Sequence, residues 1–228
     1  MAVIVPAANE EAVIGRCLAS VAAARSSLYR SSVRAQVQIL VVLDDCVDAT
    51  AAIAARFADI RPLAIAARNV GAARRAGAAA ALRSGHPSET WLASTDADSE
   101  VPADWLTTMV TIASRGAHLV LGTVLPGDGL DAGTRAAWLA RHHLRDDHPH
   151  VHGANLGIRG DAYLALGGWP PLSAGEDIDL AGRAARASHL RIVRTATIPV
   201  LTSPRRAARA PRGFSGYLSA LGAVGAAS

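Results

Sequence analysis

The stretch WLASTDAD (Trp91–Asp98) is an apolar run that ends in two carboxylates one residue apart. If the run is a buried strand, side-chain alternation places Asp96 and Asp98 on the same face, at the strand's C-terminal end. Two anions at such short spacing favour a bound cation. A hard divalent ion such as Mg²⁺ or Mn²⁺ suits oxygen ligands better than zinc, and it also neutralises substrate phosphates. The alternative is a strand that ends in an ordinary polar turn.

Two earlier segments have the pattern of strands that also end in polar residues. Ala2–Val5 is apolar and runs into the loop Pro6–Glu11, and the apolar run Val37–Leu43 stops at Asp44 and Asp45. Helical patterns lie at 12–24, 51–57 and 71–82, and a weaker strand pattern lies at 61–66. Strands that alternate with helices predict an α/β fold with a parallel sheet, whose carboxyl edge binds ligands. Because the first loop contains no glycine, a dinucleotide-binding turn is not expected there.

The second half of the chain continues with shorter elements. Helices are expected at 102–113, 131–143, 159–166 and 175–187, and extended segments at 118–124, 153–158, 191–193 and 198–201. Five histidines gather in one loop, at His142, His143, His148, His150 and His152. They allow a metal site, but their spacing matches no established ligand pattern. A flexible polar loop over the active site is the better hypothesis.

Composition sets the broad class of the protein. The 228 residues suffice for one domain with a sizeable core, and 50% of them are hydrophobic but only 4% are aromatic. Helices are therefore expected to pack closely through small side chains. No run approaches the roughly 20 apolar residues that a transmembrane helix needs, and no targeting pattern precedes Pro6. These features predict a cytoplasmic protein without an integral membrane segment.

Cysteine and charge bear on two further classes. Cys17 and Cys46 form no metal-binding spacing and are expected to be reduced thiols. The net charge is +4, and the arginines are scattered apart from one cluster near the end of the chain, at Arg205, Arg206, Arg209 and Arg212. That cluster binds phosphate or belongs to a solvated tail. Since no nucleic-acid recognition motif is present, no nucleic-acid partner is expected.

In their order along the chain, these segments resemble the family 2 glycosyltransferases of the GT-A fold, over about Val3–Thr202. The motifs that carry the resemblance are PAANEE at 6–11, DDCVDAT at 44–50, NVG and ARRAG within 69–77, DAD at 96–98, GAN and GGW within 153–169, and ED at 176–177. Cys46 and Val47 replace the family's usual Gly-Ser, and Arg75 stands where asparagine is common.

The resemblance implies one GT-A domain over 1–203, with a mostly parallel twisted sheet flanked by helices. A Rossmann-like nucleotide-binding half is expected at about 1–100, and an acceptor-binding half at about 101–203. The remaining 204–228 are expected to form a basic, disordered tail. The oligomeric state is left open, a homodimer included.

The resemblance also implies roles for particular residues. Contacts to a nucleotide-sugar donor are expected from Pro6, Ala7, Asn9, Glu10, Asp44, Asp45, Asn69, Arg74, Asp96 and Ala97. Contacts to an unknown hydroxyl acceptor are expected from Gly153, Ala154, Asn155, Trp169 and Glu176. Asp98, helped by Asp96 directly or through water, would hold Mg²⁺ or Mn²⁺, and Asp177 would be the catalytic base. A further metal ligand would be His189 or lie within 202–206, unless water fills that position or Ser203 and Arg206 contact the diphosphate instead.

The implied activity is metal-assisted transfer of a sugar from a nucleotide-diphosphate-sugar, with a UDP-sugar favoured, to an acceptor hydroxyl with inversion. A sugar-phosphate nucleotidyltransferase is an alternative, but it normally opens with a glycine-rich phosphate loop, which 6–11 is not. A nucleotide-sugar-binding protein without activity is a second alternative, and the joint presence of Asp98 and Asp177 speaks against it. A retaining transferase of the same fold is the third, and the anomeric configuration of the product distinguishes it.

Overall fold

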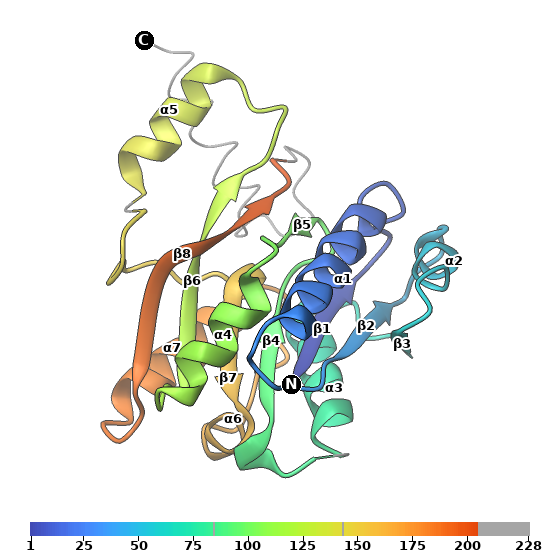
Figure 1. The fold of residues 1–228 in the computed structure, drawn as a ribbon. Coiled ribbons are helices and arrows are strands. Elements are labelled where there is room, and N and C mark those ends of the chain that lie inside the picture. The colour runs from blue at the N-terminus through green and yellow to red at the C-terminus, as the bar shows by residue number, and fades with distance from the viewer. Residues whose placement is uncertain (84, 143, 205–228) are drawn as a thin grey trace.

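One sheet of eight strands runs through the computed structural model, which describes residues 1–83, 85–142 and 144–204 (Figure 1). In spatial order the strands are β3 (Ile60–Ile65), β2 (Gln38–Asp44), β1 (Ala2–Ala7), β4 (Trp91–Ser94), β7 (Leu156–Arg159), β6 (Leu119–Pro126), β8 (Ile192–Thr202) and β5 (Ser99–Glu100). The first four pair in parallel, as do β6 and β8, whereas β7 and β5 run antiparallel to their neighbours. The predicted mostly parallel α/β sheet is confirmed.

Helices cover both faces of this sheet. They are α1 (Ile14–Arg30), α2 (Thr50–Ala54), α3 (Val70–Leu82), α4 (Trp105–Ser114), α5 (Ala132–Arg141), α6 (Gly160–Ala165) and α7 (Glu176–Arg186). Helices α1 and α4 pack on one face, and α3, α6 and α7 pack on the other (Figure 1). Helix α5 follows β6 and lies beyond the end of that strand, away from the centre of the sheet (Figure 1).

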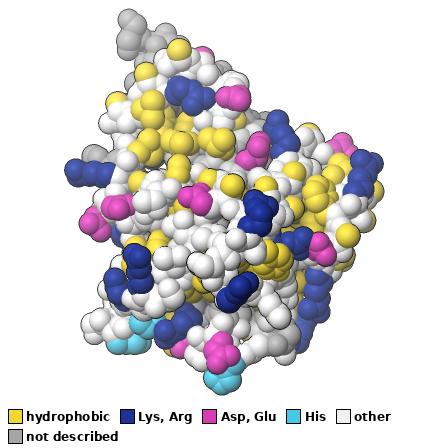
Figure 2. Space-filling model, viewed as in Figure 1, with side chains coloured by type: hydrophobic (Ala, Val, Ile, Leu, Met, Phe, Trp, Pro, Cys, Tyr) yellow, Lys and Arg dark blue, Asp and Glu magenta, His cyan; other side chains and the backbone are white. Residues whose placement is uncertain are grey.

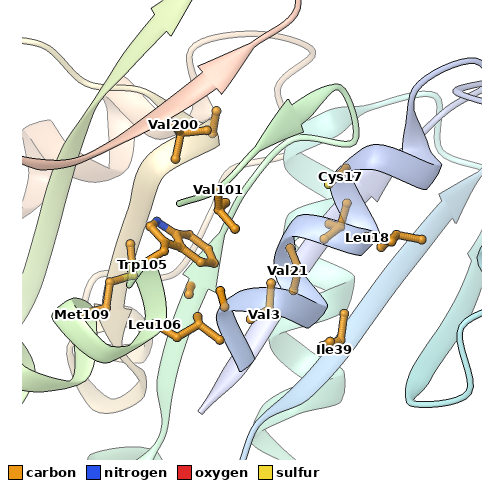
Figure 3. Close-up of a cluster of buried hydrophobic side chains, with 14 of the residues drawn as sticks. Val3, Cys17, Leu18, Val21, Ile39, Val101, Trp105, Leu106, Met109 and Val200 are labelled. Atoms are coloured by element: carbon orange, nitrogen blue, oxygen red, sulfur yellow. The ribbon is translucent and has the colours of Figure 1, made fainter. Parts of the chain in front are cut away.

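The alternation of side chains along β1 supplies two separate cores. Val3 and Val5 belong to the core under α1 and α4, and Ile4 belongs to the core under α3. In the first core, Trp105 of α4 is fully buried, and it lies on the same side of the sheet as Val21 of α1 (Figure 3). The strand is buried on both faces, as its continuous apolar run predicts.

Small residues let α3 lie close against the sheet. A Cβ added at Gly77 would lie 2.6 Å from Cγ2 of Ile4, and alanines make up most of the helix's buried face. The expectation from composition, that helices pack closely through small side chains, is confirmed at this helix. Most charged side chains of the described residues lie at the surface, where the face drawn in Figure 2 shows arginines and acids interspersed.

The strand that opens the Asp96–Asp98 motif is shorter than predicted. Strand β4 ends at Ser94, and 95–98 form a turn in which the N–H of Ser99 donates to the carbonyl of Asp96 at 3.0 Å. The turn leads into β5, which pairs with β8, so the chain has to leave the β4 direction here. The argument from strand alternation is therefore wrong, although both carboxylates still lie at the carboxyl edge of the sheet.

Further boundaries differ from the prediction, and α1, expected at 12–24, runs from Ile14 to Arg30. The separate strands expected at 191–193 and 198–201 are one strand, β8, because an irregularity in its pairing with β6 lies between Gly122 and Val124 and lets pairing resume beyond it. The helix expected through Phe57 ends at Ala54.

The chain's last segment and one histidine lie outside the described residues. These are 205–228, with the arginines expected either to bind phosphate or to belong to a solvated tail, and His143. In the described part of the chain, no helix is both long and apolar enough to span a membrane.

Candidate active site

The loops that follow β1 and β2 hold each other in place at the carboxyl edge. Asn9 adopts a left-handed backbone conformation with φ of +54°, which asparagine tolerates better than most residues. Three side chains then accept backbone N–H groups from the opposite loop: Asn9 Oδ1 from Val47 at 2.8 Å, Thr50 Oγ1 from Glu10 at 2.6 Å, and Glu11 Oε2 from Ala49 at 2.9 Å. We call this arrangement the crossed loops, 6–11 and 44–50. Pro6 and Ala7 close β1 beneath them and are buried.

The two acids of the second loop have different surroundings. Asp44 is buried, and its carboxylate accepts the backbone N–H groups of Ala67, Arg68 and Asn69 at 2.7 to 2.8 Å. Asp45 is in the left-handed region with φ of +53°, is partly exposed, and forms an ion pair with Arg68. Asp44 therefore shapes the segment before α3, and Asp45 is the carboxylate of this pair that solvent reaches.

The segment before α3 also fixes the loop that precedes α7. Asn69 caps α3 by accepting the N–H of Ala72 at 2.9 Å, and its side-chain amide donates to the carbonyl of Pro171 at 2.9 Å. Beside it, the N–H of Gly71 donates to the carbonyl of Leu172 at 3.0 Å. The start of α3 and the loop 167–175 are thus joined by direct hydrogen bonds.

Substitution of Gly71 by alanine is expected to lower the free energy of unfolding by about 1–3 kcal/mol, because a Cβ there would overlap the carbonyl oxygen of Pro170 and lie 2.9 Å from the nitrogen of Leu172. Denaturant unfolding monitored by circular dichroism measures this loss. Gly182→Ala in α7 is the matched control, because its Cβ would contact only Arg186 at 3.6 Å. A Gly71→Ala protein as stable as the control would show that the loop 167–175 yields without cost.

A single buried arginine connects three parts of the edge. Arg74 of α3 is 3% exposed, and its Nε donates to Ser94 Oγ at 2.9 Å. Its two terminal nitrogens form ion pairs with different carboxylates, one with Asp96 and the other with Glu176 at the start of α7. Glu176 is also buried, so the guanidinium compensates an acid that would otherwise be costly to bury, and it pairs with the partly exposed Asp96 as well.

Gly153 brings Asp177 to this ion-pair network. Its backbone packs against the Arg74 guanidinium, where a Cβ would come within 2.5 Å of a terminal nitrogen. Its N–H donates to Asp177 Oδ2 at 2.6 Å, while Asp177 Oδ1 accepts the N–H of Ile178 at 2.8 Å. Burial raises the pKa of Asp96; the Arg74 guanidinium opposes this rise and the nearby Asp177 adds to it. The structure therefore brings together five predicted site residues: Arg74, Asp96, Gly153, Glu176 and Asp177.

Several other predicted residues support this network from the interior. Asn155 is 0% exposed; its amide donates to the carbonyls of Thr123 and Ile198, and its Oδ1 accepts from Trp105. Trp169 is fully buried against Tyr163. Ala97 and Ala154 are buried as well. The structure gives the Asn155 amide three protein partners, so its geometry suits fixing the turn at 153–155.

The residues predicted to hold a metal differ in accessibility. Asp96 is engaged by Arg74, whereas Asp98 is partly exposed and its carbonyl accepts the N–H of Ser203 at 3.0 Å. His189 lies near His118 at the start of β6, the opposite end of that strand from Asp98. No cluster of three or more His, Cys, Asp or Glu side chains in residues 1–83, 85–142 and 144–204 is placed to hold a metal. The carboxylate oxygens of Asp96 and Asp98 are ligands of the type that a hard divalent ion prefers.

One contributor was missed in the sequence. Ser94 ends β4 and is fully buried, and it accepts the Nε–H of Arg74. A polar residue at the last position of an apolar strand, directly before the two aspartates, was the available signal. A buried thiol also contacts this turn: Cys17 in α1 donates to the carbonyl of Asp96 at 3.2 Å.

Residues 2–159, more than half of the chain, match the sequence model of Glycosyl transferase family 2, and the chain belongs to this family. A search of curated proteins gave no match.

Solved structures share the fold at low sequence identity. TarS 1–349 from S. aureus in complex with UDP-GlcNAc has a TM-score of 0.67 and 15% identity, covering 98% of this chain and 65% of that one. The mannosyltransferase PcManGT from Pyrobaculum calidifontis, in complex with GDP-Man and Mn²⁺, has a TM-score of 0.64 and 20% identity, covering 95% and 59%. Glucosyl-3-phosphoglycerate synthase from Mycobacterium tuberculosis, in complex with Mn²⁺, UDP and phosphoglyceric acid, has a TM-score of 0.54 and 19% identity, covering 85% and 66%. The likeness shows the GT-A fold, and this chain spans 65% or less of the TarS and PcManGT chains.

Proposed function

We propose that this protein transfers a sugar from a nucleotide-diphosphate-sugar, with a UDP-sugar favoured, to an acceptor hydroxyl with inversion of the anomeric carbon. The observation that carries the proposal is the buried Arg74, which joins the donor-side Asp96 to the acceptor-side Glu176. Membership of Glycosyl transferase family 2 supports it, and so do the nucleotide-sugars bound to structures of the same fold.

The donor would bind along the carboxyl edge, from the crossed loops to the turn at 95–98. Asn9, Glu10 and Asp45 border the part of the edge assigned to the nucleotide. Asp98 would hold Mg²⁺ or Mn²⁺, with Asp96 acting directly or through water, and the bound ion would neutralise the charge that develops on the leaving diphosphate. Arg74 pairs with Asp96 and Glu176, and a divalent ion held at Asp98 would supply the counter-charge for the diphosphate.

The acceptor would be activated by Asp177. This carboxylate is partly exposed, and each of its oxygens accepts one backbone N–H, which orients it. As the acceptor oxygen attacks the anomeric carbon, Asp177 would accept the hydroxyl proton. Attack opposite the leaving diphosphate inverts the anomeric configuration. The ion pair with Arg74 holds Glu176 beside this base, where it would position the acceptor.

A thermal-shift screen of nucleoside diphosphates and nucleotide-sugars, with and without Mn²⁺, tests the donor site. A ligand at one hundred times its dissociation constant is expected to stabilise the protein by about 2.7 kcal/mol. We expect stabilisation by one nucleotide, dependent on metal and absent in Asp98→Ala. Asp104→Ala removes an exposed carboxylate that makes no capping bond on α4 and should behave like the wild type.

The outcome of this screen decides between the candidate functions. A metal-dependent shift followed by sugar transfer to a hydroxyl compound supports a transferase, and NMR of the product gives its anomeric configuration. A product that retains the donor's configuration would overturn inversion. If no nucleotide stabilises the protein under any condition, the proposed donor site is wrong.

A further inference from the structure

Four histidines and one tryptophan form a layered cluster between α5 and the active site. The rings of Trp138 and His142 stack with centroids 3.9 Å apart and planes within 9°. The ring of His150 lies 4.7 Å from that of His142, 5.8 Å from that of His148 and 6.0 Å from that of His152, again nearly parallel. We call these five residues the histidine stack. Its central ring is His150.

The geometry of the histidine stack does not suit metal binding. Parallel rings 4 to 6 Å apart present faces to one another, whereas the lone pairs that bind a metal lie in the plane of each ring. Consistently, no metal-binding cluster is found in the described part of the chain. Such stacking favours uncharged imidazoles, because two charged rings at these distances repel each other.

The surroundings of the histidine stack also oppose positive charge. His148 is fully buried, and its ring nitrogens make no hydrogen bond with the described residues. The Arg194 guanidinium of β8 donates to the carbonyls of His148 and His150, both at 3.1 Å. The nearby acid Asp146 is engaged by β8 instead: its Oδ1 accepts the backbone N–H of Ala196 at 2.8 Å. The remaining charged side chains of this region, on α5 and in the loop, are exposed: Arg141, Arg145 and Asp147.

The histidine stack ends at the active site. His152 is followed by Gly153, whose N–H donates to Asp177 Oδ2 and whose backbone lies against Arg74. The carbonyl of His152 accepts the N–H of Asn155 at 3.0 Å, so its position also sets the turn at 153–155. A change in the stack therefore has a short covalent and hydrogen-bonded route to Asp177.

We propose that the histidine stack is an acid-sensitive support that holds Gly153, and through it Asp177, in the position required for transfer. The part of this inference that concerns transfer rests on the proposed function. The positioning residue is His152, which acts through Gly153. In neutral solution the uncharged rings stack and the support is intact. In acid, the ring of His152 gains a proton when it leaves the stack, so states in which the turn at 153–155 is released become more populated.

The direction of the pH effect follows from two imidazoles. Burial lowers the pKa of His152 from 6.5 to about 3, and the charges of His150, His142 and His148 act in the same direction. Burial also lowers the pKa of His148, and Arg194 adds to this, whereas backbone groups of Thr195, Leu121 and His150 act in the opposite direction. Below pH 6.5 the unfolded chain therefore binds more protons than the folded chain. Stability from these groups is present above pH 6.5 and is lost as pH falls from 6.5 towards 3.

The test replaces His152 by phenylalanine, which keeps a flat ring but binds no proton. Thermal unfolding is measured from pH 7.5 to pH 5, and transfer is assayed over the same range. The lowered pKa of His152 alone should make the ratio of folded to unfolded wild-type protein about 30-fold smaller at pH 5 than at neutral pH. We expect the midpoint of the wild type to fall more steeply than that of the variant, and its kcat to fall in acid with little change in the KM for the donor.

A second variant and a control keep the result interpretable. If His152→Phe does not fold at pH 7.5, His150→Phe removes the central imidazole of the stack and is measured in the same way. His86→Phe makes the same substitution at an exposed histidine outside the stack and should keep the wild-type pH dependence.

Each outcome bears on a different part of the inference. Equal acid sensitivity of the stack variants and the wild type in thermal unfolding would overturn the support itself. If the unfolding midpoint of the stack variants depends less on pH but their pH profile of kcat matches that of the wild type, the link between the stack and Asp177 is wrong. A protein that binds no nucleotide at any pH would defeat the proposed function, while the unfolding curves would still decide whether the stack is acid-sensitive.

Discussion

Replacement of Asp177 by asparagine is expected to lower the rate of sugar transfer by roughly 100- to 10,000-fold, the range typical for loss of a general base. Asparagine still has an oxygen that accepts the N–H of Gly153, so the turn at 153–155 and the fold are expected to persist. It cannot take up the acceptor's proton. Nucleotide binding should change little, because no donor contact is assigned to Asp177.

Transfer is measured with saturating donor, and nucleotide binding is measured separately by thermal shift. The matched control is Asp179→Asn, which alters an acid in the same helical turn that pairs with Arg183 on the surface of α7. The control should retain most of the activity. Wild-type turnover in Asp177→Asn would require a different base, and loss of nucleotide binding would indicate that Asp177 holds the donor site together.

Replacement of Arg74 by methionine is expected to cost about 3–5 kcal/mol of stability, as when one partner of a buried ion pair is removed. Methionine fills much of the arginine's volume, so the loss reflects charge more than a cavity. Without the guanidinium, the buried carboxylate of Glu176 and the partly exposed carboxylate of Asp96 lose their shared counter-charge. Denaturant unfolding gives the free energy, and Arg75→Met, at an exposed position of α3, is the control.

The pH dependence separates this explanation from simple loss of packing. Removal of Arg74 takes away the interaction that opposes the raised pKa of Asp96. A carboxyl whose pKa is raised in the folded state stabilises the protein when protonated, and this stabilisation is lost as pH rises. The deficit of Arg74→Met relative to Arg75→Met should therefore shrink in mild acid. A stability deficit that does not depend on pH would indicate lost packing. If the loss comes from charge, the double substitution Arg74→Met/Glu176→Gln should recover part of it. If the loss comes from packing, the double substitution should recover none of it.

The sequence was informative where local pattern determines structure. Apolar runs located β1 and β2, helical spacing located α1 and α3, and the polar residues after these strands correctly marked one edge of the sheet. Strand direction is not encoded in such patterns, so the antiparallel insertion of β7 between β4 and β6 was not foreseen. The same limit explains why the strand predicted at 91–98 was too long, because the pairing of β5 with β8 joins residues that are far apart in the sequence.

The partners of charged residues were the least predictable part of the site. Arg74 was expected to face the nucleotide or diphosphate, yet it pairs with Asp96, 22 residues away, and with Glu176, 102 residues away. Asn155 was expected at the acceptor, and only the packing of β6, β8 and α4 around it shows how its amide is satisfied. Residue type indicated which side chains gather at the carboxyl edge, while burial decided which of them are exposed and which provide support.

The crossed loops are already ordered by the protein's own hydrogen bonds. Each loop supplies side-chain acceptors for the backbone of the other, at Asn9, Glu11 and Thr50. A donor that binds there has little loop motion to arrest, so less of its binding free energy is lost to conformational entropy. The two loops are also interdependent as units of sequence. Grafting one of them from another enzyme, to change nucleotide preference, would leave backbone donors of the other without acceptors, so the two have to be exchanged together.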